Sequence, residues 1–162
     1  MNDGRLAPRV AALVRAFERV ARERMAGLAF LNPALDVEAV GFRACPAGAP
    51  LAFGVLVSPW FMNLVALPLE RRDTCPRTGE GAVHRVGATP FDFLACHEPA
   101  VGRFEACSLF SPMADFADMA AARATARAVL EVLYPPGSAQ REPAPARRGF
   151  LFGRPAVPRE AA

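Results

Sequence analysis

The chain has 162 residues, of which 52% are hydrophobic and 22% are charged, and its formal net charge is +3. This length predicts a single domain, and the composition is that of a globular protein, which excludes a largely disordered chain. Residues 135–162 hold five arginines and two glutamates, so the remainder is neutral overall and does not predict the continuous basic face of a nucleic-acid binder.

The apolar pattern predicts neither a secretory signal nor a membrane span. Charged residues recur through position 24, so no uninterrupted apolar segment follows the first arginines. The longest apolar run, residues 51–69, is broken by glycine, serine, asparagine and proline, whereas a span needs about 20 apolar residues. We therefore expect a cytoplasmic protein. Its four cysteines form no CxxC pair, so free thiols are expected and no zinc or rubredoxin-type site.

A helix is predicted near the N-terminus. Apolar residues recur at steps of three and four between Val10 and Ala21, which places them on one face, and arginines occupy the other. Gly27 is a stop signal of the kind that ends helices.

The middle of the chain is predicted to form β-strands. The second and third candidates are expected to form a hairpin around the Pro-Trp-Phe-Met segment that begins at Pro59. Phe91 and Phe93 alternate with Asp92, which is the period of a half-buried strand. The candidate strands cover residues 37–42, 51–57, 63–67, 83–86, 91–95 and 104–110.

A second helix is predicted to begin after Ser111-Pro112 and to continue through an alanine-rich sequence to Tyr134. Asp115 and Asp118 are expected in its opening turns, where a carboxylate is favourable against the helix dipole.

These elements together predict an α+β fold with an N-terminal helix, a mainly antiparallel β-sheet and a C-terminal helix. Residues 1–137 would form this single domain. Residues 138–162 are rich in proline, alanine and arginine and are predicted to be a flexible tail, which carries the segment RRGFLFGR at 147–154.

No catalytic site is predicted. Cys107 with His97 and an acid, Asp92 or Glu98, would make a cysteine–histidine arrangement, but nothing in the spacing supports it. Phosphate-binding glycine loops and the context of a nucleophilic serine are absent from the sequence. We therefore expect no enzyme activity, no cofactor and no bound nucleic acid.

Four short segments follow one another along the chain: LAFLNP at 28–33, SPWFMNL at 58–64, CSLFSPM at 107–113 and RRGFLFGR at 147–154. Aromatic and methionine side chains in loops either form partner-binding surfaces or cap the core, and the residues alone leave both interpretations open. In this order and spacing, the segments resemble the HybE/HupJ family of nickel–iron hydrogenase assembly (maturation) chaperones over almost the whole chain. The matching positions are Phe30, Pro33, Pro59, Trp60, Cys107, Ser108, Pro112, Phe152 and Gly153.

The resemblance implies a protein that binds another protein and is not an enzyme. Members of the family are small cytoplasmic proteins without known cofactors. They are thought to bind the hydrogenase small-subunit precursor, including its twin-arginine signal peptide, and to delay export until maturation is complete. Other maturation factors or a separate rubredoxin are further candidate partners. The alternatives are a scaffold that joins maturation factors without touching the signal peptide, and a small cysteine-dependent enzyme.

A site can be expected from the chemistry of such a signal, in which two arginines precede an apolar segment. An apolar groove would shield that segment from water, at about 25 cal/mol per Å² buried, and carboxylates would pair with the arginines. In the tail, Phe150 and Phe152 would either dock on the domain or act as a mobile hook for a partner. The candidate groove residues are Trp60, Phe61, Met62, Phe110 and Met113, and the candidate carboxylates are Glu70, Asp73, Glu98 and Glu105.

Overall fold

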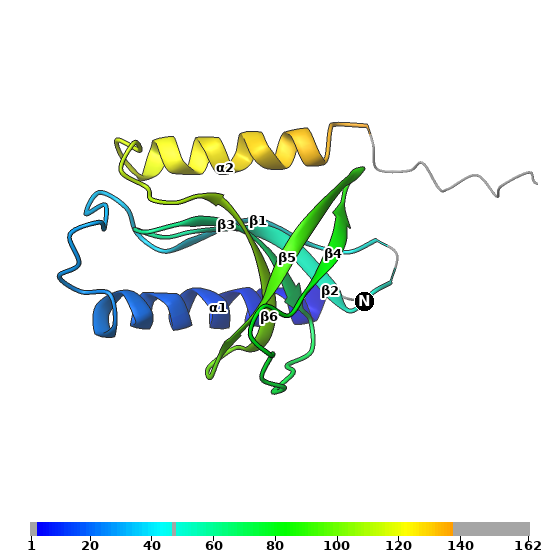
Figure 1. The fold of residues 1–162 in the computed structure, drawn as a ribbon. Coiled ribbons are helices and arrows are strands. Elements are labelled where there is room, and N and C mark those ends of the chain that lie inside the picture. The colour runs from blue at the N-terminus through cyan, green and yellow to red at the C-terminus, as the bar shows by residue number, and fades with distance from the viewer. Residues whose placement is uncertain (1–2, 47, 138–162) are drawn as a thin grey trace, which may run out of the picture.

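The computed structural model describes residues 3–46 and 48–137. In chain order these form α1 (Asp3–Glu23), β1 (Glu38–Ala44), β2 (Leu51–Val57), β3 (Met62–Pro68), β4 (Gly81–Val86), β5 (Thr89–Glu98), β6 (Gly102–Phe110) and α2 (Met119–Leu133). The strands make one antiparallel sheet in the order β1-β2-β3-β6-β5-β4, with α1 on one face and α2 on the other (Figure 1). The predicted α+β class is confirmed, whereas the predicted tail at 138–162 lies outside the described residues.

Strands β2 and β3 are buried on both faces because a helix covers each side of the sheet. Their sequences are accordingly apolar almost without interruption, instead of alternating between apolar and polar residues. Val55 and Leu64 pack toward α2, whereas Leu56 and Val65 pack toward α1. The core therefore consists of two apolar layers separated by the sheet.

Helix α1 lies on the sheet with Leu13 and Ala16 buried beneath it. The expectation that arginines occupy only its outer face is wrong for Arg9, which is half-buried. The Nε of Arg9 donates to the carbonyl oxygen of Pro68, and its Nη1 donates to that of Val101, both at 2.9 Å. Neither α1 nor any other helix in the described ranges is long and apolar enough to cross a membrane.

Helix α2 begins later than the sequence predicts. Its first residue is Met119, and Asp118 is the N-cap, whose carboxylate accepts a hydrogen bond from the Ala121 amide at 2.8 Å. Asp115 lies before the helix instead of in its first turn. The segment before the helix is tied to the buried Asn32, whose Nδ2 donates to the carbonyl oxygens of Met113 and Phe116 at 3.0 and 2.7 Å.

An ion pair connects α2 to the edge strand β1. The Nε and Nη2 of Arg123 donate to the two carboxylate oxygens of Glu38, each at 2.7 Å. This bidentate hydrogen bonding is the main cause that lowers the pKa of the Glu38 carboxyl. Arg123 therefore contacts the sheet through its charge while Ala122 and Ala126 pack into the core.

Candidate partner-binding groove

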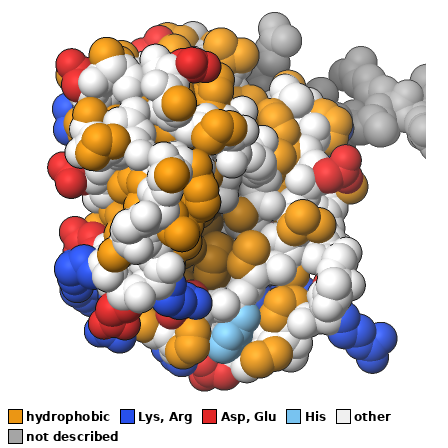
Figure 2. All heavy atoms as spheres, turned by 60° about the vertical axis from the view of Figure 1, so that its left-hand side comes forward, with side chains coloured by type: hydrophobic (Ala, Val, Ile, Leu, Met, Phe, Trp, Pro, Cys, Tyr) orange, Lys and Arg blue, Asp and Glu red, His pale blue; other side chains and the backbone are white. Residues whose placement is uncertain are grey.

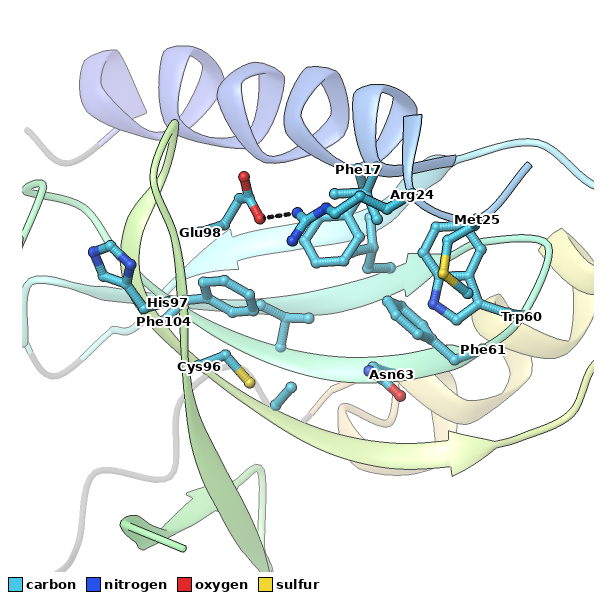
Figure 3. A pocket seen from close by; sticks show the side chains of 14 residues that line it. Phe17, Arg24, Met25, Trp60, Phe61, Asn63, Cys96, His97, Glu98 and Phe104 are labelled. Atoms are coloured by element: carbon cyan, nitrogen blue, oxygen red, sulfur yellow. Dashed lines mark hydrogen bonds and ion pairs between the residues drawn. The ribbon is translucent and has the colours of Figure 1, made fainter. Parts of the chain in front are cut away.

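The side of the sheet that faces α1 carries a groove that the helix leaves partly open. Its walls are the C-terminal half of α1, the turn between β2 and β3, and parts of β5 and β6, and its volume is about 330 Å³. Figure 2, which brings the left-hand side of Figure 1 forward, shows a hollow in which hydrophobic side chains gather, with charged side chains near its rim. The lining residues, most of them apolar, are Phe17, Val20, Arg24, Met25, Leu56, Trp60, Phe61, Asn63, Val65, Cys96, His97, Glu98, Phe104 and Ala106 (Figure 3).

The turn between β2 and β3 is organised by Ser58, which is fully buried. Its hydroxyl oxygen accepts hydrogen bonds from the amides of Trp60 and Phe61, at 3.3 and 3.0 Å. The backbone amide of Ser58 donates to the carbonyl oxygen of Phe61 at 2.9 Å. The backbone amide of Asn32 donates to the carbonyl oxygen of Pro59. This network of a serine-based turn positions two adjacent aromatic side chains at the mouth of the groove.

Four aromatic rings form the apolar wall, with Phe17 at their centre. The Phe17 ring lies 5.6 Å from Phe61 and 6.0 Å from Phe104 in edge-to-face geometry, and 6.4 Å from Trp60 in stacked geometry. Phe61 and Phe17 pack against the buried layer beneath α1, whereas Trp60 lies outside them at the opening. Trp60 thus packs on the rings of Phe17 and Phe61 with one side and keeps part of its surface exposed to solvent.

An ion pair spans the groove between the end of α1 and the end of β5. Arg24 donates to Glu98 across this gap (Figure 3). The Glu98 side chain is 16% exposed and the Arg24 side chain 60% exposed, so the carboxylate lies inside and the guanidinium on the solvent side. The guanidinium therefore covers the carboxylate from the solvent side.

The groove also contains a buried acceptor without a hydrogen-bond donor. Asn63 lies on β3 with its side chain toward the groove, and its Oδ1 atom is buried and unpaired among the described residues. A buried unpaired acceptor costs about 1–3 kcal/mol, so Oδ1 of Asn63 is a candidate acceptor for a donor from a partner.

The structure brings only two of the five predicted groove residues together. Trp60 and Phe61 line the groove, but Met62 and Met113 are fully buried in the apolar layer beneath α2, and their assignment to the groove is corrected. Phe110 is partly exposed and packs edge-to-face on Phe116, away from the groove lining. The cause is strand geometry: consecutive side chains point to opposite faces, so Phe61 and Met62 enter different layers.

The four candidate carboxylates are also spread over the surface. Only Glu98 lines the groove. Glu70 pairs with Arg5, and Asp73 pairs with Arg71. Glu105 pairs with His84, on the α2-facing side of β6. These three acids lie outside the groove lining, so they do not form one site with Trp60 and Phe61, and their contact with a partner stays a prediction.

Several groove residues escaped the sequence interpretation, although their pattern was visible. Phe17 and Val20 belong to the apolar stripe of α1, and Phe104 and Ala106 alternate on β6. An apolar stripe on a helix does not by itself show which of its side chains are covered by the sheet and which remain in an open groove. Phe150 and Phe152, the tail residues predicted to contact the domain or a partner, lie outside the described residues.

The cysteine–histidine arrangement is not assembled in the described part of the chain. His97 on β5 lies opposite Arg103 of β6, four residues, or about 13 Å, along that strand from Cys107, which packs against the layer beneath α2. Burial, and then the nearby Asp92 carboxylate, raise the pKa of the Cys107 thiol, and burial chiefly raises the pKa of Cys96. No cluster of histidine, cysteine or acidic side chains in the described ranges is placed to hold a metal ion.

The raised pKa values predict slow alkylation of two thiols. Because the thiolate is the reactive form, Cys96 and Cys107 should react with iodoacetamide at least about tenfold more slowly near neutral pH than the exposed Cys75. Mass spectrometry of digested samples over time measures each rate, and Cys75→Ser identifies the fast site. Rapid, selective labelling of Cys107 would contradict this expectation and favour the cysteine-dependent enzyme.

Comparison with known sequences shows that the chain is similar to proteins of hydrogenase assembly and formation. Residues 8–153 match the sequence profile of a family described as "[NiFe]-hydrogenase assembly, chaperone, HybE". The chain is 44% identical over 160 residues to protein HoxT of Cupriavidus necator, covering 90% of this chain and 89% of that protein. It is 40% identical over 151 residues to hydrogenase expression/formation protein HupJ of Bradyrhizobium diazoefficiens, covering 87% and 85% respectively.

Two further similarities support narrower conclusions. A protein of Rhodobacter capsulatus named probable rubredoxin HupJ is 36% identical over 137 residues, but the match takes in only 48% of that protein. The solution structure of HybE from Escherichia coli aligns with a TM-score of 0.60 over 92% of this chain and 91% of that chain. Its sequence identity is 23%, so this likeness shows the fold alone.

Proposed function

Because this chain belongs to the HybE family of nickel–iron hydrogenase assembly chaperones, we propose that it binds a hydrogenase small-subunit precursor through the twin-arginine signal peptide of that precursor. Bound in this way, it delays export until the subunit has matured. It acts in the cytoplasm by binding alone, without catalysis and without a cofactor. The observation that carries the proposal is the aromatic groove at Trp60, with the Glu98 carboxylate at one end.

The apolar part of the signal would lie along the aromatic wall. Trp60 and Phe17 stack at the opening, and Leu56, Val65 and Ala106 form the floor, so a side chain placed there leaves water on most sides. A volume of about 330 Å³ is at the lower end for ligand pockets and suits a few apolar side chains of a peptide. Such a shallow site gives the moderate affinity that release of the precursor requires.

The paired arginines of the signal would exchange with Arg24. The Glu98 carboxylate is held inside the groove wall, and Arg24 covers it from the solvent side. Arg24 donates one hydrogen bond to Glu98, through Nη2. A guanidinium of the signal would take the place of Arg24 and pair with both carboxylate oxygens of Glu98. Recognition therefore depends on arginine in particular, because lysine has no planar pair of donors.

Additional partners follow from the family. Other maturation factors would meet the chaperone while it holds the precursor. One relative is named a probable rubredoxin and is about twice as long as the matched region. We include a separately encoded rubredoxin among the proposed partners for this reason.

The test is a fluorescence-polarisation titration of the full chain with a labelled twin-arginine signal peptide. We expect a Kd on the order of micromolar, and at least about a tenfold weaker Kd when both arginines of the peptide are replaced by lysine. The precursor is titrated in parallel, with and without its signal. Equal affinity for the two forms of the precursor would contradict the role of the signal and favour contact with the folded subunit or a scaffold.

Asn63→Leu should separate binding from folding. Removing the unpaired buried acceptor should raise the free energy of unfolding by about 1 kcal/mol. The reason is that Oδ1 loses its hydrogen bonds to water on folding without gaining a partner, and leucine does not have this cost. The same change should weaken peptide binding by about tenfold, since the bound peptide loses a hydrogen bond to that oxygen. Urea unfolding and the polarisation titration measure the two effects.

Ser108→Ala is the matched control for this variant. Ser108 is the residue opposite Asn63 on β6, but it is exposed and does not line the groove. Neither stability nor affinity should change appreciably. Asn63→Leu that binds peptide as tightly as the wild type would show that Oδ1 has no part in recognition.

A further inference from the structure

We propose that the segment Arg147–Arg154 of this chain's own tail docks in the groove and competes with the signal peptide. The inference rests on the proposed function only for the identity of the competitor. The docking itself rests on the sequence of the tail, the charges around the groove and the reach of the chain. The tail would thereby act as a built-in substitute ligand that keeps the aromatic surface covered until a precursor arrives.

The tail segment has the same chemical order as a twin-arginine signal. Arg147 and Arg148 are followed after one glycine by three large apolar residues, Phe150 to Phe152, and then by Arg154. The match to the family profile extends to residue 153, so all of this segment except Arg154 lies within the matched region. A groove that binds two arginines followed by an apolar stretch should therefore also bind this segment.

The charges on β5 complement those of the tail. Side chains alternate along the strand, and Phe93 is buried toward α2, so Asp92, Leu94 and Glu98 face the other side together with Cys96. Leu94 is 61% exposed and lies between the two acids. This acidic–apolar–acidic order spans six residues, about 20 Å, and faces the groove side of the sheet.

The basic–apolar–basic order of the tail has a similar length. Arg148 and Arg154 are six residues apart, which is about 20 Å in an extended chain, with the apolar residues between them. An extended segment can therefore place an arginine near Asp92 or Glu98 at each end and its phenylalanines over Leu94 and the aromatic wall. Asp92 is exposed and, within the described ranges, forms no ion pair, so its charge is open to such a contact.

The chain is long enough for this docking to occur within one molecule. The turn at Gly87 touches the end of α2, where a Cβ on Gly87 would lie 1.8 Å from the carbonyl oxygen of Leu133. From that turn, β5 leads over ten residues, about 33 Å, to Glu98 at the groove. Phe150 lies thirteen residues beyond Gly137, which is about 43 Å when extended, so the segment reaches the groove.

Tethering makes even a weak contact effective. A linker of this length gives an effective concentration of about 1 mM, so a segment with an intrinsic Kd of about 0.1 mM would occupy the groove most of the time. A competing peptide would then bind about tenfold more weakly than to an open groove. The tail therefore raises the affinity that a ligand needs in order to displace it. A signal peptide that is joined to a precursor, and so makes further contacts, can reach that affinity.

Trp60 reports on occupancy, because it is the sole tryptophan of the chain and lines the groove. The full chain is compared with the tail variant Phe150→Ser/Phe152→Ser and with Val157→Ser, a control that changes an apolar tail residue outside the segment. We expect acrylamide to quench Trp60 at least about twofold more strongly in the double variant than in the wild type or the control. Far-UV circular dichroism verifies that all three are equally folded.

The outcomes distinguish this inference from the proposed function. Stronger quenching in the double variant, independent of protein concentration, supports docking within the chain, even if the labelled signal peptide does not bind at all. If the signal peptide binds, its Kd should be about tenfold lower for the double variant. Equal quenching in wild type and double variant overturns the inference and leaves signal binding intact. Quenching that differs only at high protein concentration also overturns it, since the tail would then dock on a second copy.

Discussion

Trp60→Ala should weaken binding of the twin-arginine signal peptide by about 30-fold or more while the chain remains folded. A large aromatic residue at the centre of a binding surface typically contributes 2 kcal/mol or more, and about 1.4 kcal/mol corresponds to tenfold in Kd. Folding should change little, because Trp60 lies outside the buried layer that Phe17 and Phe61 join. The measurement is the polarisation titration, with urea unfolding to verify stability.

Val132→Ala is the control for this variant, because Val132 is 80% exposed on α2 and far from the groove lining. It should bind the peptide as the wild type does. The titration is repeated in the Phe150→Ser/Phe152→Ser background. Since the tail would occupy the same surface, Trp60→Ala in the full chain weakens the competitor too, and the loss should be larger when the tail is inactive. A folded Trp60→Ala variant with wild-type affinity in both backgrounds would refute the groove as the binding site.

Gly87→Ala should lower the free energy of unfolding by about 3 kcal/mol. Gly87 has a φ of 61°, where a residue with a Cβ costs about 1–2 kcal/mol. A Cβ there would lie 1.8 Å from the carbonyl oxygen of Leu133, which is backbone, so the turn or the end of α2 must move and adds about 1–3 kcal/mol. Urea denaturation followed by circular dichroism measures the change.

Gly79→Ala separates the two costs. Gly79 has a φ of 76°, but a Cβ there would meet nothing within 4 Å. It should therefore lose only about 1 kcal/mol. An equal loss of unfolding free energy in the two variants would contradict this expectation. It would mean that α2 and the turn between β4 and β5 can move apart at no energetic cost.

The interior strands could be predicted closely from the sequence. The predicted strand 51–57 coincides with β2, and 63–67 lies within β3, because strands covered on both faces need unbroken apolar runs that few other elements use. Family membership was also available, since the four segments keep their order along the chain. Of the five predicted groove residues, Trp60 and Phe61 line a groove, and their contact with a partner stays a prediction.

The errors share one origin, which is that sidedness depends on distant contacts. Phe61 and Met62 are adjacent and similarly apolar, yet one lines the groove and the other is buried beneath α2. The segment before α2 is held by Asn32, more than 80 residues earlier in the chain, whose side chain donates to the carbonyl oxygens of Met113 and Phe116. All four candidate carboxylates form ion pairs, and three of these pairs join residues more than 20 positions apart, which only the folded chain brings together.

The sequence by itself therefore determined the order and approximate positions of the helices and strands, and to which family the chain belongs, because both are read from patterns along the chain. Only the tertiary structure decided which apolar side chains remain at a surface, that Glu98 is the acid beside the aromatic wall, and that Gly87 must lack a side chain. Each of these depends on what packs against a residue from elsewhere in the chain, and the physical interactions concerned, burial, ion pairing and steric exclusion, act through space.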